Sequence, residues 1–505
     1  MKKIISLLLL TAVVGMAAAQ NIAYQQGEKT NKKAYQSSMI KLLPGNKQGE
    51  IVSVEPELKA VTTIGDPNHS IKSVLVRLVD AEWNETQSVK IANTAEWGIS
   101  DAFRTESQIH LLLDNVEKQN YTIRHVALDA ATLQVSVDEH LMKTTLEKGS
   151  EGYFLTATSP DGQYHGVVFS ALGKKNVVIE TRMLLFDKEM KKVWEQKVDN
   201  NIAHKMLVSN QGDIVIYSMS FTDKSKDETV VRFNAANAQG VKYGEFVTAD
   251  DIDQLALLQY KGGNLVATAL EGQGGRSLIQ FSLPGHVAGR HYLAVHSYFF
   301  DMNVGRLTAD NRHEFTDDEA CVFFNTKVPP IVKPDFLTQV DQVTTDDGGY
   351  VLYHRIWKVE TRNTKTGMTV SETVYSRGFL LVHIDNAGNL LWTRGIMQNN
   401  QNANWPNVEA DLFEYNGNLY VVTNEAKDAP EEYSAKEPAL NSGKLILANT
   451  ALAIYKFTPQ GVGSKQMLAR DGKHLLFSPL FHSGDGRFYL LSGALAPKIS
   501  TVVIP

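Results

Sequence analysis

A glycine-bearing polar turn between two short apolar runs recurs along this chain. Strand-rich units that repeat every ~40 to 50 residues are typical of β-propellers. Measured between the last glycine of each turn, the first two intervals are 50 and 51 residues, and the later ones are 86, 68 and 69. The turns are Asp161-Gly162, Gln211-Gly212, Gly262-Gly263, Asp347-Gly348-Gly349, Asn416-Gly417 and Asp485-Gly486.

Each repeating unit contains a second hairpin. Most segments have the alternating or continuous apolar character of short strands, and convincing amphipathic helices are nearly absent. In two units an apolar strand ends at an aspartate and a tryptophan follows seven residues later, at Asp187 and Trp194 and again at Asp385 and Trp392. Two hairpins supply four strands, which is one propeller blade.

The units predict an all-β fold with a single β-propeller of four-stranded blades. The count favours seven blades, and six or eight are also compatible. A half-blade at 474–496 is expected to gain its outer strands from Ser73–Trp83 and Thr86–Ala92, so that N- and C-terminal strands close the ring and remove an open sheet edge. Residues 20–70 are interpreted as an N-terminal extension, and the propeller as 71–505. The complete blades are expected at 95–142, 150–199, 204–248, 252–300, 336–397 and 407–471.

The first residues are typical of an export signal. Two lysines follow Met1, an apolar run extends from Ile4 to Val14, and small residues precede Gln20. This pattern predicts a secretory signal peptide over residues 1–19, cleaved after Ala19. The apolar run is too short to span a bilayer of roughly 30 Å, and no later segment is apolar enough for a membrane helix. We therefore expect an exported protein that is periplasmic, at the cell surface or secreted.

Charge and cysteine content limit the partners and the chemistry. Removal of Lys2 and Lys3 with the signal peptide changes the formal net charge from −6 to −8. A mildly acidic chain argues against a nucleic-acid partner, which requires a basic surface. The single cysteine, Cys321, excludes an internal disulfide, and its apolar neighbours favour a buried small side chain over a nucleophile.

Residues 344–392 resemble a known type of repeat. This segment contains Asp347-Gly348-Gly349-Tyr350, followed by the pattern D-x-x-G-x-x-x-W from Asp385 to Trp392. The pair of motifs resembles the repeats of bacterial secreted β-propellers, and it is also similar to quinoprotein-type blades. The resemblance covers about 50 of the 505 residues well. It implies the fold and brings no catalytic residues with it, because such repeats are structural.

Long connections gather on one face of the predicted propeller, which we call the long-loop face. Strands A to D of a blade place the A–B and C–D turns on one face and the B–C and D–A connections on the other. Long loops in compact folds are usually functional or disordered, so this face is the predicted binding surface, with tolerated insertions as the alternative. The four connections are Lys358–Gly378, Ala426–Lys444, Met397–Asn407 and Asp301–Asp335, the last of them interpreted as an insertion.

Candidate binding residues lie on or beside these connections. Trp, Tyr and Arg dominate binding hot spots because they bury a large area and still offer hydrogen-bond donors. Each candidate is also compatible with a packing role. The candidates are Trp357, Arg362, Trp405, Tyr433, His296, Tyr298 and Arg306.

No motif for catalysis or metal binding is recognised. His286, His291 and His296 are five residues apart, and odd spacing on a strand alternates faces, so they are not expected to converge on zinc. Aspartates in the turns favour turn formation over calcium binding. Neither a nucleophile elbow nor a phosphate or dinucleotide fingerprint is found in a supporting context. We expect no catalytic residue, metal or cofactor.

Two functional hypotheses follow. The leading one is an exported, non-catalytic binding or scaffold protein of the bacterial envelope that holds a protein or a glycan on the long-loop face. The alternative is a carbohydrate-active hydrolase or lyase with its site at the channel mouth on the same face. The fold does not choose between them. Acids converging in a deep channel would favour the enzyme, and a broad aromatic surface would favour the binder.

Overall fold

The computed structural model contains strands and turns, with no α-helix among the residues it describes. None of the described segments is therefore a helix long and apolar enough to cross a membrane. The described residues are 22–25, 40–46, 50–58, 71–80, 84–117, 119–174, 177–221, 228–249, 252–273, 291–315, 336–345, 347–363, 369–403, 410–433, 450–470, 481–482, 486–492 and 498–505.

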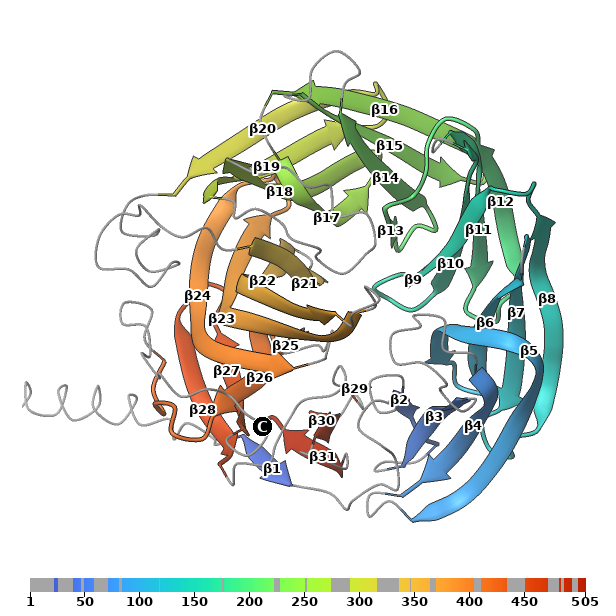
Figure 1. The fold of residues 1–505 in the computed structure, drawn as a ribbon, viewed down its shortest axis with the longest axis horizontal. Coiled ribbons are helices and arrows are strands. Elements are labelled where there is room, and N and C mark those ends of the chain that lie inside the picture. The colour runs from blue at the N-terminus through green and yellow to red at the C-terminus, as the bar shows by residue number, and fades with distance from the viewer. Residues whose placement is uncertain are drawn as a thin grey trace, which may run out of the picture.

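The described strands form eight four-stranded antiparallel blades arranged in a ring (Figure 1). Blades 1 and 2 share one long strand, β5, whose first half pairs with β4 and whose second half pairs with β6. Blade 1 contains β2 (Lys41–Pro44), β3 (Ile51–Leu58), β4 (Ile71–Val79) and the start of β5 (Glu85–Arg104). Blade 2 contains the end of β5, β6 (Gln108–Glu117), β7 (Asn120–Asp129) and β8 (Val135–Thr145).

Blades 3 to 7 each follow the chain in simple order. Blades 3 and 4 contain β9 (Glu151–Thr158), β10 (Tyr164–Leu172), β11 (Val178–Asp187), β12 (Lys192–Val198), β13 (Lys205–Val208), β14 (Ile214–Phe221), β15 (Thr229–Asn237) and β16 (Gly240–Thr248). Blades 5 and 6 contain β17 (Ile252–Lys261), β18 (Asn264–Gln273), β19 (His291–Asp301), β20 (Arg306–Glu314), β21 (Phe336–Thr345), β22 (Gly348–Asn363), β23 (Thr369–Asp385) and β24 (Leu390–Ala403). Blade 7 contains β25 (Ala410–Tyr415), β26 (Asn418–Ala426), β27 (Thr450–Phe457) and β28 (Gly463–Ala469).

Blade 8 joins the two ends of the chain. Its C-terminal strands are β29 (Phe481–His482), β30 (Arg487–Ser492) and β31 (Lys498–Val503), and its outer strand is β1 (Ala23–Gln25). The backbone of Ile22 exchanges hydrogen bonds with the side chain of Gln466 at 3.0 and 2.6 Å, which also ties this end to blade 7. Closure by N- and C-terminal strands is thus confirmed.

The strands that close the ring are not the predicted ones. Ser73–Trp83 and Thr86–Ala92 were expected to complete blade 8, but β4 and the start of β5 occupy this region and pair within blade 1. The reason is that β2 and β3, which lie in the supposed extension of residues 20–70, supply the inner half of a blade of their own. The ring therefore holds eight blades, the upper end of the predicted range.

The recurring turns behave as expected at the inner hairpins. Gly162, Gly212, Gly263, Gly417 and Gly486 all have positive φ, between 69 and 89°. In the remaining turn, at Asp347-Gly348-Gly349, Gly348 takes this role with φ of 145°, and not the following Gly349. A side chain at Gly348 would meet the backbone of Ile384 and Asp385, so this position requires glycine.

The aspartate–tryptophan spacing also has a structural cause. The Asp187 carboxylate accepts hydrogen bonds from backbone N–H groups of its own C–D turn, and Asp385 does the same. The indole N–H of Trp194 then donates to the carbonyl of Gly212 in blade 4 at 3.0 Å, and that of Trp392 to Pro459 in blade 7 at 2.9 Å. Each tryptophan therefore fastens its blade to the next.

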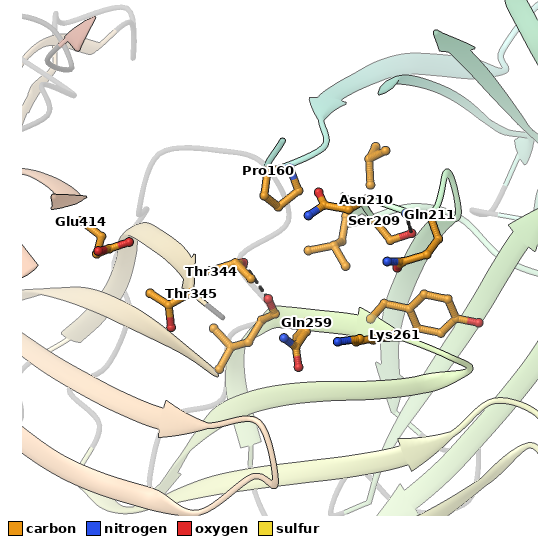
Figure 2. A pocket seen from close by; sticks show the side chains of 13 residues that line it. Pro160, Ser209, Asn210, Gln211, Gln259, Lys261, Thr344, Thr345 and Glu414 are labelled. Carbon is orange, nitrogen blue, oxygen red and sulfur yellow. Dashed lines mark hydrogen bonds between the residues drawn. The ribbon is translucent and has the colours of Figure 1, made fainter. Parts of the chain in front are cut away.

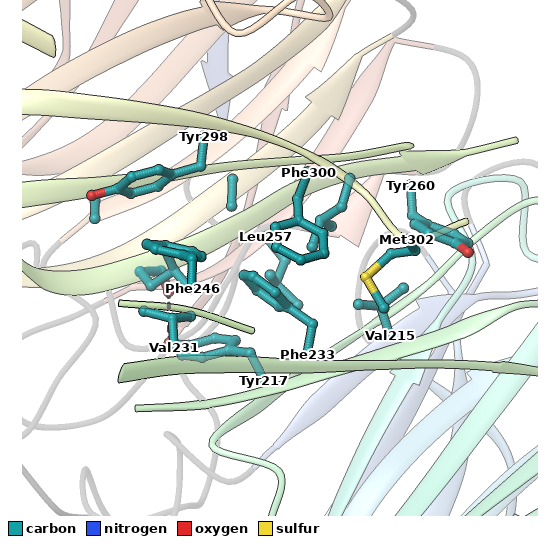
Figure 3. Close-up of a cluster of buried hydrophobic side chains, with 14 of the residues drawn as sticks. Val215, Tyr217, Val231, Phe233, Phe246, Leu257, Tyr260, Tyr298, Phe300 and Met302 are labelled. Carbon is teal, nitrogen blue, oxygen red and sulfur yellow. Dashed lines mark hydrogen bonds between the residues drawn. The ribbon is translucent and has the colours of Figure 1, made fainter. Parts of the chain in front are cut away.

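The core is divided among the interfaces between blades. Between blades 4 and 5, aromatic rings of β19 pack against rings of blade 4 (Figure 3). The ring centroids of Phe233 and Phe300 are 5.2 Å apart, and those of Phe246 and Tyr298 are 4.8 Å apart. Each large side chain buried in this way contributes about 1.5–3 kcal/mol, which explains how the ring holds together.

Three of the long connections are partly strands, and one of them, Met397–Asn407, contains the end of β24. β20 falls inside Asp301–Asp335 and pairs along β19, so this segment is not wholly an insertion but contains the fourth strand of blade 5. Lys358–Gly378 contains a continuation of the β22–β23 hairpin, whose last pair is Asn363 with Thr369. The remaining residues 316–335, which include Cys321, lie outside the described residues.

Candidate functional site

The innermost strands surround the axis of the ring. β29, β2, the end of β5, β9, β13, β17, β21 and β25 contact one another in succession, as expected for the A strands of neighbouring blades. In a propeller these innermost strands line the central channel, so polar side chains on them lie near the axis.

Three charged residues on these inner strands form what we call the axial cluster, Lys205, Asp341 and Asp411. They come from β13 in blade 4, β21 in blade 6 and β25 in blade 7. Lys205 and Asp341 are half-buried, and Asp411 is 7% exposed. Charged side chains are rarely buried unless they are paired, so their concentration here is the most unusual polar feature of the inner wall.

The two carboxylates of the axial cluster lie next to each other. Both accept a hydrogen bond from the backbone N–H of Leu412, at 3.3 Å for Asp341 Oδ2 and 3.0 Å for Asp411 Oδ1. A β-bulge between Gln339 and Asp341 aims the Asp341 side chain, and the N–H of Gln342 donates to Asp341 Oδ1 at 2.8 Å. Two carboxylates that share one donor repel each other when both are ionised, which favours the protonated form of one of them.

Burial dominates the electrostatics of this cluster. It raises the pKa of Asp341, although hydrogen bonds from Gln342, Leu412 and Asp411 and the charge of Lys205 act in the opposite direction. Burial also lowers the pKa of Lys205 to about 8, with Asp341 opposing the change. Such perturbed groups on a concave wall mark a functional-site candidate.

A polar pocket of about 240 Å³ is lined by residues of the inner strands β13, β17, β21 and β25 and of the turns beside them (Figure 2). We call it the axial pocket. It is formed by inner-strand ends and A–B turns, so it lies on the short-turn face, opposite to the long-loop face on which the sequence placed the site. Its lining is Pro160, Leu207, Val208, Ser209, Asn210, Gln211, Leu258, Gln259, Tyr260, Lys261, Thr344, Thr345 and Glu414.

Residues of the pocket and of the cluster lie on the same strands, β21 and β25. Thr344 is three residues beyond Asp341 on β21, and Glu414 is three residues beyond Asp411 on β25. At a rise of roughly 3.3 Å per residue, the cluster therefore lies about 10 Å deeper along the strands than the pocket rim. The same inner strands thus carry the cluster and the pocket at different depths.

Among the sequence candidates whose side chains the structure describes, His296 is the one that lies in a cluster of charges. Its Nε2 is 2.7 Å from Glu271 Oε2, and its Nδ1 is 3.0 Å from Asp310 Oδ1. Arg312 binds the same Glu271 with two nitrogens, at 2.6 and 3.2 Å. This network joins β18, β19 and β20 within blade 5, which gives His296 a role in holding the blade.

The other candidates are dispersed. Tyr298 is fully buried in the interface between blades 4 and 5. Tyr433 is half-buried edge-on against Tyr455, and its hydroxyl donates to the carbonyl of Gly395 at 3.3 Å. Arg306 is exposed at the start of β20. Trp357 and Arg362 lie on β22, where only the backbone is described, and Trp405 lies outside the described residues.

The axial cluster was missed from the sequence, although a signal exists. Asp341 is the one charged residue of its inner strand, Asp411 shares its strand with Glu414, and each aspartate lies five or six residues before a recurring glycine turn. Asp101 at the end of β5 also lies on an inner strand, and its carboxylate likewise accepts the N–H that follows it, at 2.8 Å. Within the described part of the chain, no three His, Cys, Asp or Glu side chains form a metal-binding group.

The eight blades and the axial pocket define the class of this protein as a β-propeller. No family model and no curated protein matches the chain. It is similar to the β-propeller domain of the Trilobed protease from Pyrococcus furiosus, at 10% identity and a TM-score of 0.34 over 86% of this chain and 96% of that one.

Two further solved structures are comparably similar to the chain. The Dos1 propeller is 8% identical, with a TM-score of 0.37 over 95% of each chain. Lignostilbene dioxygenase from Pseudomonas brassicacearum is 11% identical, with a TM-score of 0.36 over 97% of this chain and 94% of that one. Similarities of this size carry no functional argument, so the function is argued from the site alone.

Proposed function

We propose that this protein is an exported, non-catalytic β-propeller binding protein of the bacterial envelope, and that it holds part of a protein or a glycan in the axial pocket. The observation that carries the proposal is a polar pocket on the ring axis whose hydrogen-bonding side chains face solvent. The signal-peptide pattern at the N-terminus supports export.

The long-loop face is proposed as a second contact surface for a large partner. There β22 pairs with β23 as far as Asn363 and Thr369. The end of β24 pairs with β23 as far as Ala403 and Thr373. A strand-built projection offers a partner a more ordered surface than a flexible loop would.

A hydrolase is the second candidate, and the Asp341–Asp411 pair is the observation that favours it. Glycosidases use two carboxyl groups roughly 5 to 10 Å apart with substrate between them. Here the two groups bind the same N–H and each other, and Asp411 is almost fully buried. This arrangement leaves no room for a substrate between the carboxyl groups and supports the binding function first.

Export is tested by expressing the full chain in a bacterial host and determining the mass of the protein recovered from the periplasm. A mass that corresponds to a chain starting at Gln20 is expected. A protein that stays in the cytoplasm with residues 1–19 attached would contradict the export proposal.

Binding is tested with a peptide library and a glycan array, using wild type and the pocket-filling variant Gln259→Trp. The matched control is Gln239→Trp, because Gln239 is exposed on a C–D turn outside the pocket. We expect a ligand that binds wild type and the control but not the pocket variant. Ligands that are unaffected by Gln259→Trp, or turnover of a glycoside that Asp411→Asn abolishes, would contradict the proposal.

A further inference from the structure

We propose that the axial pocket recognises the end of an uncharged glycan by enclosing one terminal sugar residue. This inference rests on the proposed binding function and names the class of its ligand.

The hydrogen-bonding groups of the pocket suit hydroxyl groups. The amide groups of Gln211 and Gln259, Asn210 Nδ2 and Lys261 Nζ have no hydrogen-bond partner among the described residues. Amide side chains both donate and accept, as a sugar hydroxyl does. A ligand with several hydroxyl groups can therefore satisfy these groups together, whereas an apolar ligand would leave them unpaired at a cost.

Several other polar groups of the lining are already fixed in place. The Thr344 hydroxyl donates to the carbonyl of Leu258 at 2.6 Å, and Asn210 Oδ1 accepts the N–H of Asp161 at 3.1 Å. Glu414 Oε1 accepts the N–H of Gly417 at 2.8 Å. These bonds hold the wall of the pocket, so that the free amides are presented on a preorganised surface, which reduces the entropy lost on binding.

The charges around the pocket are balanced, which favours an uncharged ligand. The lining contains one lysine, Lys261, and one glutamate, Glu414. Deeper along the strands, the positive charge of Lys205 acts on the carboxyl group of Asp341, so opposite charges are paired there as well. A site that selected an anion or a cation would be expected to carry an excess of the opposite charge.

The size and position of the pocket indicate a chain end. A volume of about 240 Å³ is smaller than the roughly 300–1,000 Å³ of sites that enclose a drug-sized ligand. One sugar ring is therefore a better fit than several. Gln211, Lys261 and Glu414 are exposed at the rim, so the rest of a glycan can leave the pocket directly into solvent.

The test measures binding of defined glycans to wild type at pH 7 by array and calorimetry. We expect the bound glycans to share an uncharged terminal residue, and its removal with an exoglycosidase to reduce binding at least tenfold. Gln259→Ala and Gln211→Ala should each weaken binding about tenfold, and the exposed control Gln239→Ala should leave it unchanged.

Several results would overturn this inference. They are a preference for sialylated or amino-sugar termini, binding to internal segments that survives the exoglycosidase, insensitivity to both pocket variants, and no binding to any glycan. If a peptide binds and Gln259→Trp abolishes its binding while no glycan binds, this inference fails and the proposed function stands. If neither class of ligand depends on the pocket, both fail.

Discussion

Asp341 and Asp411 belong to different blades, yet their carboxylates accept hydrogen bonds from the same backbone N–H, that of Leu412, at 3.3 and 3.0 Å. Burial of two neighbouring acids costs folding free energy unless their charge is compensated. Lys205 provides the nearby positive charge that reduces this cost. The cluster couples blades 4, 6 and 7 by charge.

Replacement of Asp341 by asparagine should stabilise the protein at neutral pH. The folded-state pKa of Asp341 is raised, mainly by burial, so its stabilising contribution is present at low pH and is lost as the pH rises through that pKa. An amide keeps the shape and can donate to Asp411. We expect a higher urea midpoint for Asp341→Asn at pH 7 than for wild type, and no difference near pH 3. A lower midpoint at pH 7 would contradict the assigned protonation.

Three buried histidines between blades 2 and 3 should make the protein sensitive to acid. His110 Nδ1 is 2.9 Å from His125 Nε2, and Phe103 stacks between His110 and His165. Burial lowers the pKa of His110 to about 3 and that of His165 to about 4, and it lowers the pKa of His125 despite the nearby acid Glu139.

Because these folded-state pKa values lie below the unfolded value of about 6.5, the stability is complete above pH 6.5 and is lost as the pH falls toward 4. For His165 the loss amounts to about 3 kcal/mol at pH 4. His165→Phe should reduce the pH dependence of the free energy of unfolding, measured with urea between pH 4 and 7. The exposed His140 serves as the control, and His140→Gln should change the pH dependence of the free energy of unfolding little. Equal slopes for wild type and His165→Phe would refute the assignment.

His296 should stabilise blade 5 by neutralising two acids. Only a protonated imidazole can donate to both Glu271 and Asp310, and both distances are hydrogen-bonding distances. His296→Ala removes both bonds and should cost about 3 kcal/mol of unfolding free energy. In a double-mutant cycle, adding Glu271→Gln should cost less in the His296→Ala background than in wild type. Additive costs would show that the two residues do not interact.

Replacement of residues 301–335 by a short Gly-Ser linker should unfold blade 5. The segment contains β20, which carries Arg312. β20 pairs with β19 from the partners Glu314 and Ala294 to the partners Arg306 and Asp301. Its loss leaves the edge of β19 open and Glu271 without its guanidinium. We expect a fall in melting temperature of more than 10 °C by calorimetry. Folding that is unchanged by the replacement would restore the view that the whole segment is an insertion.

Local features of the fold were predictable because they depend on near neighbours in the chain. The positive φ at Gly212 follows from a tight turn, and the strand β14 follows from the apolar residues after it. The spacing from Asp385 to Trp392 marked a hairpin, although the bond from Trp392 to Pro459 of the next blade could not be read from it.

The sequence by itself determined that this chain forms four-stranded antiparallel units with short inner turns, because periodicity and turn chemistry act over a few residues. Only the tertiary structure decided that there are eight units and that β1 completes the last one. It also decided that the carboxylates of Asp341 and Asp411 share the N–H of Leu412. Those outcomes depend on contacts between residues 70 to 480 positions apart. Ring closure sets such contacts, and no local pattern in the chain encodes which inner strands will become neighbours.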